Sequence, residues 1–473
     1  MQFSGDHIVS RTKPFCALSV IRSFFAVMLF LASFVLVSSQ PSHAIPAFAR
    51  KYGLPCSACH IGWPILNVFG QQFRDNGYQL GNERDAPIYQ NNGYWPITFR
   101  VTPQWHLESQ TKVAVDPTLT SPAGEQTITT HGFDLSGLDI WTAGTLYKNI
   151  SFSVLPSMAE GDAFHFENAW VRFDNLANSP WLDLKVGKFE LDMLLSQKRF
   201  LTLSNVGGFW YNYQFLPPGD INGFGGIGDN QLGVELSGHS KNSYARYSIA
   251  LLSSVDGNPG LTSQGQGGTA RTYDVFANVN EGFDVKGLGV QRVGLVGYVG
   301  RSPTYFLTQT VGGVTTPLEA QGNKSFSRVG AYGWWFIKAL DIETLYLHGQ
   351  DNSFLGNGVA ANDPAGLPPG AAGPTWNGGF VEAHYTVNPQ FILTGRYELV
   401  HMSRQANAAL QAKPNLGNVD SFTIGYRWYP IMSSRGGLAF HNEYAQAKTG
   451  NTSLLTGSDQ TARSVMIGFD FDY

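Results

Sequence analysis

The sequence predicts an all-β transmembrane barrel of about 16 antiparallel strands, preceded by a short, partly helical N-terminal segment that plugs the lumen. Three observations predict it. Segments of about ten residues alternate between apolar and polar side chains, and the connections between them alternate between short and long. The chain also ends on an aromatic residue directly after an alternating strand, which is similar to the sorting signal of outer-membrane barrels. A soluble array of β-sandwiches is the alternative.

Residues 1–44 are typical of a secretory signal peptide. An apolar run, FFAVMLFLASFVLV at 24–37, follows a basic start, and the small residues SHA precede an expected cleavage after Ala44. The run is shorter than the roughly 20 residues that a membrane-spanning helix needs. The mature protein is therefore expected to be exported. The basic residues of the start are Arg11, Lys13 and Arg22.

The cysteines form one compact motif. The chain has three, of which Cys16 would leave with the signal peptide, so the mature protein keeps only Cys56 and Cys59. They stand in the C-x-x-C-H pattern CSACH, which is the signature of covalent haem c attachment, with His60 as the proximal iron ligand. The spacing suits two thiols that add to two haem vinyl groups. A redox-active pair and half of a zinc site are the alternatives, but neither has the expected context.

The sequence does not fix the second axial ligand of such a haem. The first methionine of the mature chain is Met158, so a His/Met pairing cannot be made within the motif's own segment. His106 is the leading candidate for the distal ligand, because the alternation of residues 97–108 points it into the barrel. An open sixth position is a further alternative, as is another lumen histidine. Those histidines are His165, His384 and His441.

Period-two alternation is clearest in three segments. WPITFRVTPQWHLES at 95–109, DSFTIGYRWYP at 420–430 and TARSVMIGFDFDY at 461–473 each place apolar side chains on one face and polar ones on the other. The connections expected to be short are 147–150, 239–243, 338–341 and 388–390. Those expected to be long are 110–131, 194–229, 256–268, 307–324, 353–374 and 404–418.

One long connection, residues 205–230, is rich in aromatic side chains, so it either folds back into the lumen or packs as an ordinary outer loop. Without residues 1–44, Lys plus Arg falls from 31 to 28 and Asp plus Glu from 35 to 34, which moves the net charge from −4 to −6. No nucleic-acid partner is therefore expected. The predicted organisation is a signal peptide at 1–44, a monohaem cytochrome c-like plug at 45–93 and a porin-like barrel at 94–473.

The plug is expected to contain one short helix. PILNVFGQQFRDNGYQL at 64–80 spaces its apolar residues in a helical pattern, and Gly77 suits the helix end. About fifty residues are too few to bury a haem, so the barrel wall is expected to cover it. Arg50 and Lys51 either pair with a haem propionate or remain solvated.

Residues 44–80 resemble the N-terminal domain of the fused monohaem cytochrome–porins, the outer-membrane iron oxidases of iron-oxidising bacteria. Besides the motif itself, the resemblance rests on Pro46, Phe48, Ala49, Arg50, Pro64, Leu66, Asn67, Phe69, Gly70, Phe73, Gly77 and Tyr78. It implies an electron-transfer protein in the outer membrane of a Gram-negative-type bacterium, with the haem segment in the lumen facing the periplasm. It assigns Cys56, Cys59 and His60 to the haem, but it carries over no iron-binding residue.

The resemblance implies oxidation of extracellular Fe(II) at the haem and transfer of the electron to a periplasmic c-type cytochrome. One haem cannot bridge the roughly 25 Å apolar band, so donor and acceptor must approach from opposite ends. The alternatives are an outward electron conduit, another donor, and a diffusion porin in which the segment is a plug or sensor. A peroxidase-like site with an open iron position belongs with this last group.

Overall fold

The computed structural model describes residues 47–62, 64–80, 97–116, 124–158, 163–196, 201–202, 230–253, 273–305, 308–311, 314–317, 320–351, 373–405, 411–432, 437–453 and 456–472. All of them belong to one of two units, residues 43–473. The predicted signal peptide at 1–44 and the predicted boundary at residue 93 lie outside the described residues. No helix in the described ranges is long and apolar enough to cross a membrane.

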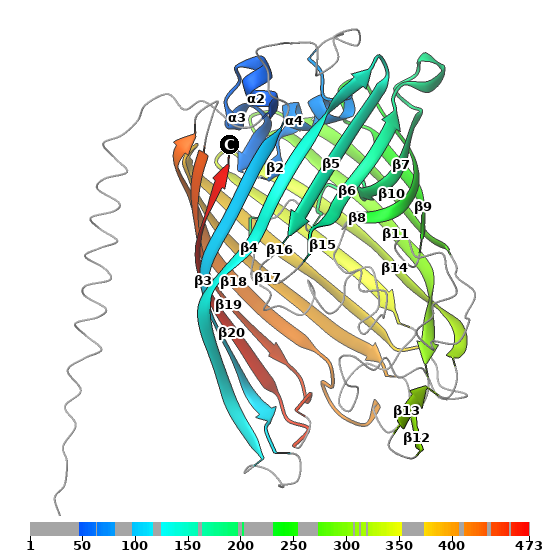
Figure 1. Cartoon of the computed structure of the whole chain (residues 1–473), viewed down its shortest axis with the longest axis vertical. Coiled ribbons are helices and arrows are strands. Elements are labelled where there is room, and N and C mark those ends of the chain that lie inside the picture. The colour runs from blue at the N-terminus through cyan, green and yellow to red at the C-terminus, as the bar shows by residue number, and fades with distance from the viewer. Residues whose placement is uncertain are drawn as a thin grey trace, which may run out of the picture. The chain divides into compact units, whose positions relative to one another are not determined.

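Sixteen antiparallel strands among the described residues close into one barrel, because β20 pairs with β3 (Figure 1). This confirms the predicted fold class. The strands are β3 (Thr98–Ala114), β4 (Glu125–Tyr147), β5 (Ile150–Met158), β6 (His165–Phe173), β7 (Asp183–Glu190), β8 (Asn230–His239), β9 (Arg246–Ser253), β10 (Tyr273–Val285), β11 (Gly289–Tyr305), β14 (Ala320–Ile337), β15 (Leu340–Gln350), β16 (Thr375–Asn388), β17 (Phe391–Arg404), β18 (Val419–Met432), β19 (Gly437–Thr449) and β20 (Gln460–Asp472).

The strands carry an apolar outer face and a largely polar inner face. On β20, Ile467, Phe469 and Phe471 are exposed on the outside, whereas Ser464 and Asp470 are buried inside, as the alternation predicted. A β-barrel satisfies every backbone hydrogen bond between neighbouring strands, so an apolar outer surface can face lipid. The barrel therefore fits an outer membrane.

The connections agree with the sequence at the short-turn end, and the predicted long connection 404–418 matches the stretch between β17 and β18. The four predicted short turns join β4 to β5, β8 to β9, β14 to β15 and β16 to β17. The predicted long connection 110–131 is wrong over most of its length, since β3 and β4 extend into it as a two-stranded ribbon. Within 307–324, β12 (Thr308–Val311) and β13 (Val314–Pro317) pair as a separate hairpin. The sequence favours it, because β-branched residues stand on both sides of a Gly-Gly pair.

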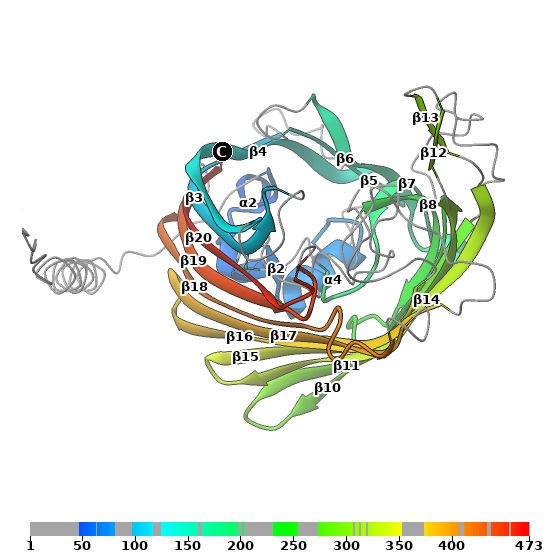
Figure 2. The same cartoon turned by 90° about the horizontal axis from the view of Figure 1, so that it is seen from below.

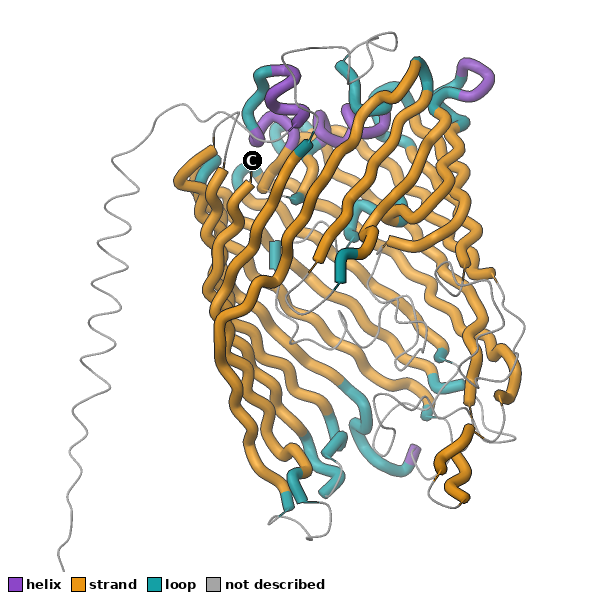
Figure 3. Tube along the Cα trace, in the orientation of Figure 1, coloured by secondary structure: helices purple, strands orange, loops and turns teal. Residues whose placement is uncertain are grey.

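The N-terminal segment consists of α2 (Ala47–Tyr52), α3 (Cys56–Cys59), β1 (His60–Gly62), β2 (Ile65–Leu66) and α4 (Val68–Asp75). Figure 2 shows these elements within the ring of strands. Figure 3 shows their helical turns at the upper end of the barrel. Gln72 and Gln79 donate hydrogen bonds to backbone carbonyls of Asn242 and Lys148, in two of the short turns. The segment therefore lies at the short-turn end of the barrel.

The predicted helix starts later than its apolar spacing suggested. Asn67 caps α4 by accepting a hydrogen bond from the Gly70 amide at 2.9 Å, which fixes the start at Val68. Ile65 lies before this cap and pairs in β2 instead. The predicted end is confirmed, because Gly77 follows α4 with a φ of 73° that favours glycine.

Candidate functional site

A cavity of about 280 Å³ lies between the N-terminal segment and the barrel wall. The two cysteines of the motif and His60 border it, so the structure brings the three predicted haem residues to one wall. Cys56 and Cys59 are three residues apart on α3 and therefore neighbours on the helix surface. Much of the remaining wall is aromatic and includes Phe48, Tyr52, Phe73, Trp141, Trp170 and Tyr429.

The hairpin of β1 and β2 orients His60. Its Nδ1 lies 3.2 Å from the carbonyl oxygen of Ile65. When Nδ1–H donates to this carbonyl, Nε2 carries the lone pair that a metal needs. A hydrogen bond from the second ring nitrogen to a backbone carbonyl is a usual way in which proteins orient a metal-binding histidine.

Asn67 and Gly70 hold the motif against α4. The Asn67 amide group donates to the carbonyl of Ala58 at 3.0 Å, and its backbone amide donates to the carbonyl of Cys59 at 2.9 Å. A side chain at Gly70 would overlap the Cys59 carbonyl oxygen, so this contact requires glycine. Asn67 and Gly70 belong to the residues that carry the resemblance, but the sequence predicts no role for either.

The described surroundings of the thiols do not favour the two alternatives for the motif. Cys56 and Cys59 form no disulfide with each other. Burial, and then the nearby Cys56, raises the pKa of the Cys59 thiol to about 11. Redox-active C-x-x-C pairs instead contain a cysteine of lowered pKa. Among the described residues, no cluster of three metal-binding side chains includes either cysteine, so half of a zinc site is not completed here.

The polar edge of the cavity fits the carboxylates of a haem. Arg100 borders it and makes an ion pair with Asp470 at 3.4 Å, yet its buried Nε has no hydrogen-bond partner. A buried guanidinium nitrogen without a partner calls for an acceptor, which a propionate would supply. Asp139 and Asp472 also border the cavity and oppose an anion there. Lys51 lies over the Tyr52 ring at 4.8 Å, and the side chain of Arg50 lies outside the described residues.

Met432, at the end of β18, contributes the one thioether among the described residues that line the cavity. It packs beside the cluster that contains Ile65 and Tyr429. Met432 could not be predicted from the sequence, because only closure of the barrel brings β18 next to the motif.

The predicted histidines lie elsewhere. His106 faces inward, as expected, opposite Met466, but its Nδ1 pairs with Asp134 at 2.8 Å and it does not line the described cavity. His165, His384 and His441 do not line the described cavity either. His106 as distal ligand therefore stays a prediction.

Buried charges tie the segment to the barrel wall. Asp75, at the end of α4, makes an ion pair with Arg246 of β9, which also binds Asp192 at 2.6 Å. Burial alone would raise the pKa of Asp75, but the Arg246 guanidinium outweighs it and the pKa is lowered. From β6, Arg172 donates to the carbonyl oxygens of Arg74 and Asp75 at 2.9 and 3.2 Å, which caps the C-terminus of α4.

Aromatic packing adds a second attachment. The ring of Phe48 stacks on Tyr78 at 5.0 Å and meets Phe73 edge-on at 5.0 Å. Phe48 also contacts Trp141 of β4 at 5.7 Å, and Tyr78 stacks on Trp170 of β6 at 6.2 Å. Since such pairs contribute beyond their buried area, α2 and α4 are held to the wall as one unit.

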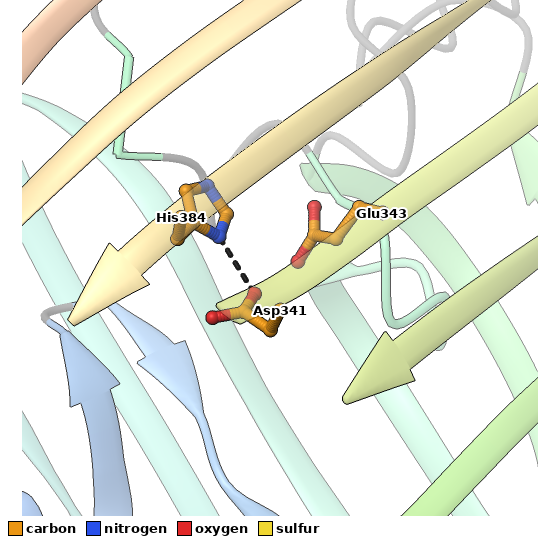
Figure 4. A group of neighbouring side chains, drawn as sticks. All are labelled: Asp341, Glu343 and His384. Carbon is orange, nitrogen blue, oxygen red and sulfur yellow. Dashed lines mark hydrogen bonds and ion pairs between the residues drawn. The ribbon is translucent and has the colours of Figure 1, made fainter. Parts of the chain in front are cut away.

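A second group of polar side chains lies on β15 and β16 (Figure 4). Asp341, Glu343 and His384 are buried, and their metal-binding atoms lie within 4.8 Å of one another. His384 Nδ1 contacts Asp341 at 2.8 Å, and its Nε2 contacts Glu382 at 2.8 Å. The sequence offers His384 only as an alternative haem ligand and does not predict this group.

Solved structures similar to this chain are outer-membrane proteins. A mutant of OmpT of Vibrio cholerae that lacks loop L8 is 13% identical, with a TM-score of 0.47, over 80% of this chain and 99% of that chain. An anion-selective porin from Comamonas acidovorans is 12% identical, with a TM-score of 0.48, over 80% and 99%. Salmonella typhi OmpF in complex with daunomycin is 8% identical, with a TM-score of 0.46, over 78% and 96%. No protein-family model and no curated protein sequence matches the chain.

Proposed function

We propose that this porin-like barrel is an outer-membrane electron-transfer protein that oxidises extracellular Fe(II) and passes the electron to a periplasmic c-type cytochrome. One covalent haem c would be held by Cys56 and Cys59, with His60 as its proximal ligand. The observation that carries the proposal is the contact of His60 Nδ1 with the Ile65 carbonyl, beside a largely aromatic cavity that both cysteines border.

Haem, when bound, supplies a one-electron carrier. The residues of this chain would hold it, exclude water and set its potential. Met432 borders the cavity and suits the distal position better than His106, because the His/Met pair is common in cytochromes c. Arg100 would receive a propionate at its Nε. The aromatic wall lowers the local dielectric, and burial of this kind is one of the means by which proteins tune haem potentials.

The position of the segment supports the direction of transfer. It lies at the short-turn end, which in outer-membrane barrels faces the periplasm. A periplasmic cytochrome would approach this end, and Fe(II) would enter the polar lumen from the other. The proposed organisation is a signal peptide at 1–44, a haem segment at 45–93 and a barrel at 94–473 in outer-membrane lipid.

Stopped-flow absorbance tests the proposal. Purified, oxidised protein is mixed with Fe(II) at the growth pH of the organism, and the reduced α-band of haem should appear within seconds. A double variant with Cys56→Ala and Cys59→Ala should give no band. Haem that dithionite reduces but Fe(II) leaves oxidised would contradict Fe(II) as the donor while keeping the haem site.

A second candidate function is a diffusion porin with a plug. The buried ion pair between Asp75 and Arg246 favours this function, because it holds the segment inside one end of the barrel without any haem. Planar-bilayer conductance distinguishes the two. If the protein is a plugged porin, Asp75→Asn should loosen the segment and raise the ion conductance. If it is an electron-transfer protein, the same variant should lose haem reduction by Fe(II).

A further inference from the structure

We propose that Asp341, Glu343 and His384 form a binding site for a divalent first-row transition-metal ion in the wall of the lumen. The three side chains converge from the adjacent strands β15 and β16, with Asp341 directly opposite His384 in the register (Figure 4). Their ligand atoms lie within 4.8 Å of one another. Two ligand atoms of an ion with bonds of about 2.0–2.2 Å lie about 3.0–3.5 Å apart, so binding would draw the most distant pair together by about 1–2 Å.

The surrounding side chains hold His384 and Asp341 in place by hydrogen bonds, as the neighbours of metal ligands do. Glu382 accepts from His384 Nε2 at 2.8 Å, which leaves Nδ1 as the nitrogen directed at Asp341. Glu382 is itself held by Arg396 at 3.3 Å. A carboxylate behind a histidine in this way orients the ring and raises its basicity as a ligand. The indole Nε1 of Trp334 donates to Asp341 at 3.3 Å and fixes that carboxylate.

Glu343 gives an independent reason to expect a ligand. Its side chain is 2% exposed, and its Oε2 is buried with no hydrogen-bond partner. Buried carboxylate oxygens are normally paired, because an ionised carboxylate without a partner loses its hydration without compensation. Figure 4 shows Glu343 on the same side of the strands as Asp341 and His384. A cation shared by the three side chains would satisfy this oxygen.

The charges around the group also favour a cation. Four buried carboxylates lie here, those of Asp341, Glu343, Glu382 and Glu398. The basic groups that face them in the described contacts are His384 and Arg396. Two carboxylates with one imidazole are ligands for Fe(II), Mn(II), Co(II) or Zn(II), whereas a site for Ca²⁺ would be built from oxygen alone.

The site lies close to the cavity of the N-terminal segment. Trp334, which donates to Asp341, belongs to the apolar cluster of Ile65, and Met432 packs against this cluster. Metal binding at this group does not depend on haem at the motif, so the inference stands apart from the proposed function.

Equilibrium dialysis against Co(II) tests the inference on full-length mature protein in detergent, without a polyhistidine tag. Cobalt is used instead of iron, because any haem iron would add to the amount of iron measured. Bound cobalt is quantified by mass spectrometry. The wild type should retain about one Co(II) per chain after chelator treatment and reloading. Glu343→Gln and Asp341→Asn should each weaken Co(II) binding about tenfold or more.

The matched control is Glu443→Gln, which makes the same change at a buried carboxylate on β19 and should leave binding unchanged. Glu343→Gln should not cause misfolding. It removes the charge of a buried carboxylate whose Oε2 has no hydrogen-bond partner in the wild type. Metal-free Glu343→Gln should unfold at no lower temperature than the wild type, and Co(II) should raise the unfolding temperature of the wild type only. Absence of bound Co(II), or equal binding by the wild type and both site variants, would overturn the inference.

Discussion

The carbonyl oxygen of Cys59 lies so close to the Cα of Gly70 that no side chain fits between them. We expect Gly70→Ala to separate α3 from α4 at a cost of about 1–3 kcal/mol, despite the better helix propensity of alanine. The haem content per barrel, measured from the pyridine haemochrome spectrum, should fall. Gly132→Ala is the control, because a Cβ at Gly132 meets no atom within 4 Å. Equal haem content in both variants would show that the contact is not required.

Replacement of Met432 should change the spectrum of ferric haem without removing the haem. If Met432 is the distal ligand, Met432→Ala loses the weak methionine-to-iron charge-transfer band and shifts the iron to high spin. His106→Ala should leave the band intact, because His106 pairs with Asp134 and does not line the described cavity. A spectrum altered by His106→Ala and not by Met432→Ala would reverse this assignment.

Attachment of the segment should depend on pH through Asp75. Its pKa is lowered in the folded protein, so its ion pair with Arg246 stabilises the attachment above the ordinary aspartate pKa of about 3.9. That stabilisation is lost as the pH falls through the lowered pKa. The loss should begin below about pH 4 and become complete only below the lowered pKa, where residues 47–80 should become accessible to an acid-active protease while the barrel remains folded.

Asp75→Asn should release the segment at neutral pH. Loss of one partner of a buried ion pair costs about 3 kcal/mol, although Arg246 keeps its contact with Asp192. Limited proteolysis at pH 7 measures this release. Asp459→Asn, which breaks an exposed pair with Lys448, is the control and should resemble the wild type. Equal cleavage of all three proteins would mean that aromatic packing alone holds the segment.

Arg100 should influence the reduction potential if it faces a propionate. A cation near the haem stabilises the reduced state, which carries one more electron. We expect Arg100→Gln to lower the potential by about 60 mV, which is a tenfold change for a one-electron couple. Arg463→Gln, at an exposed position on β20, should leave the potential unchanged in a spectroelectrochemical titration. An unchanged potential for Arg100→Gln would place the propionates elsewhere.

Local sequence patterns predicted the barrel well and the site only partly. The alternation of residues 461–473 depends on the strand period alone, and the spacing of Cys56 and Cys59 depends on one helical turn, so both could be found without a structure. Met432 and Arg246 could not, because their roles arise when distant strands close around the segment. The group of Asp341, Glu343 and His384 could not be predicted for the same reason, since its residues come from two strands joined by a long connection.

The ribbon formed by β3 and β4 extends beyond both neighbouring strands, since β5 pairs with β4 only from Leu138 onward and β20 pairs with β3 only as far as Gln110. β4 has 23 residues, whereas β7 has 8, and about ten suffice to cross an outer membrane. Residues 126–131 are exposed on both faces of the strand, as expected of a ribbon in water. An epitope inserted between β3 and β4 would therefore be displayed clear of the lipid surface. Antibody labelling of intact cells at that epitope would report which end of the barrel faces the surroundings.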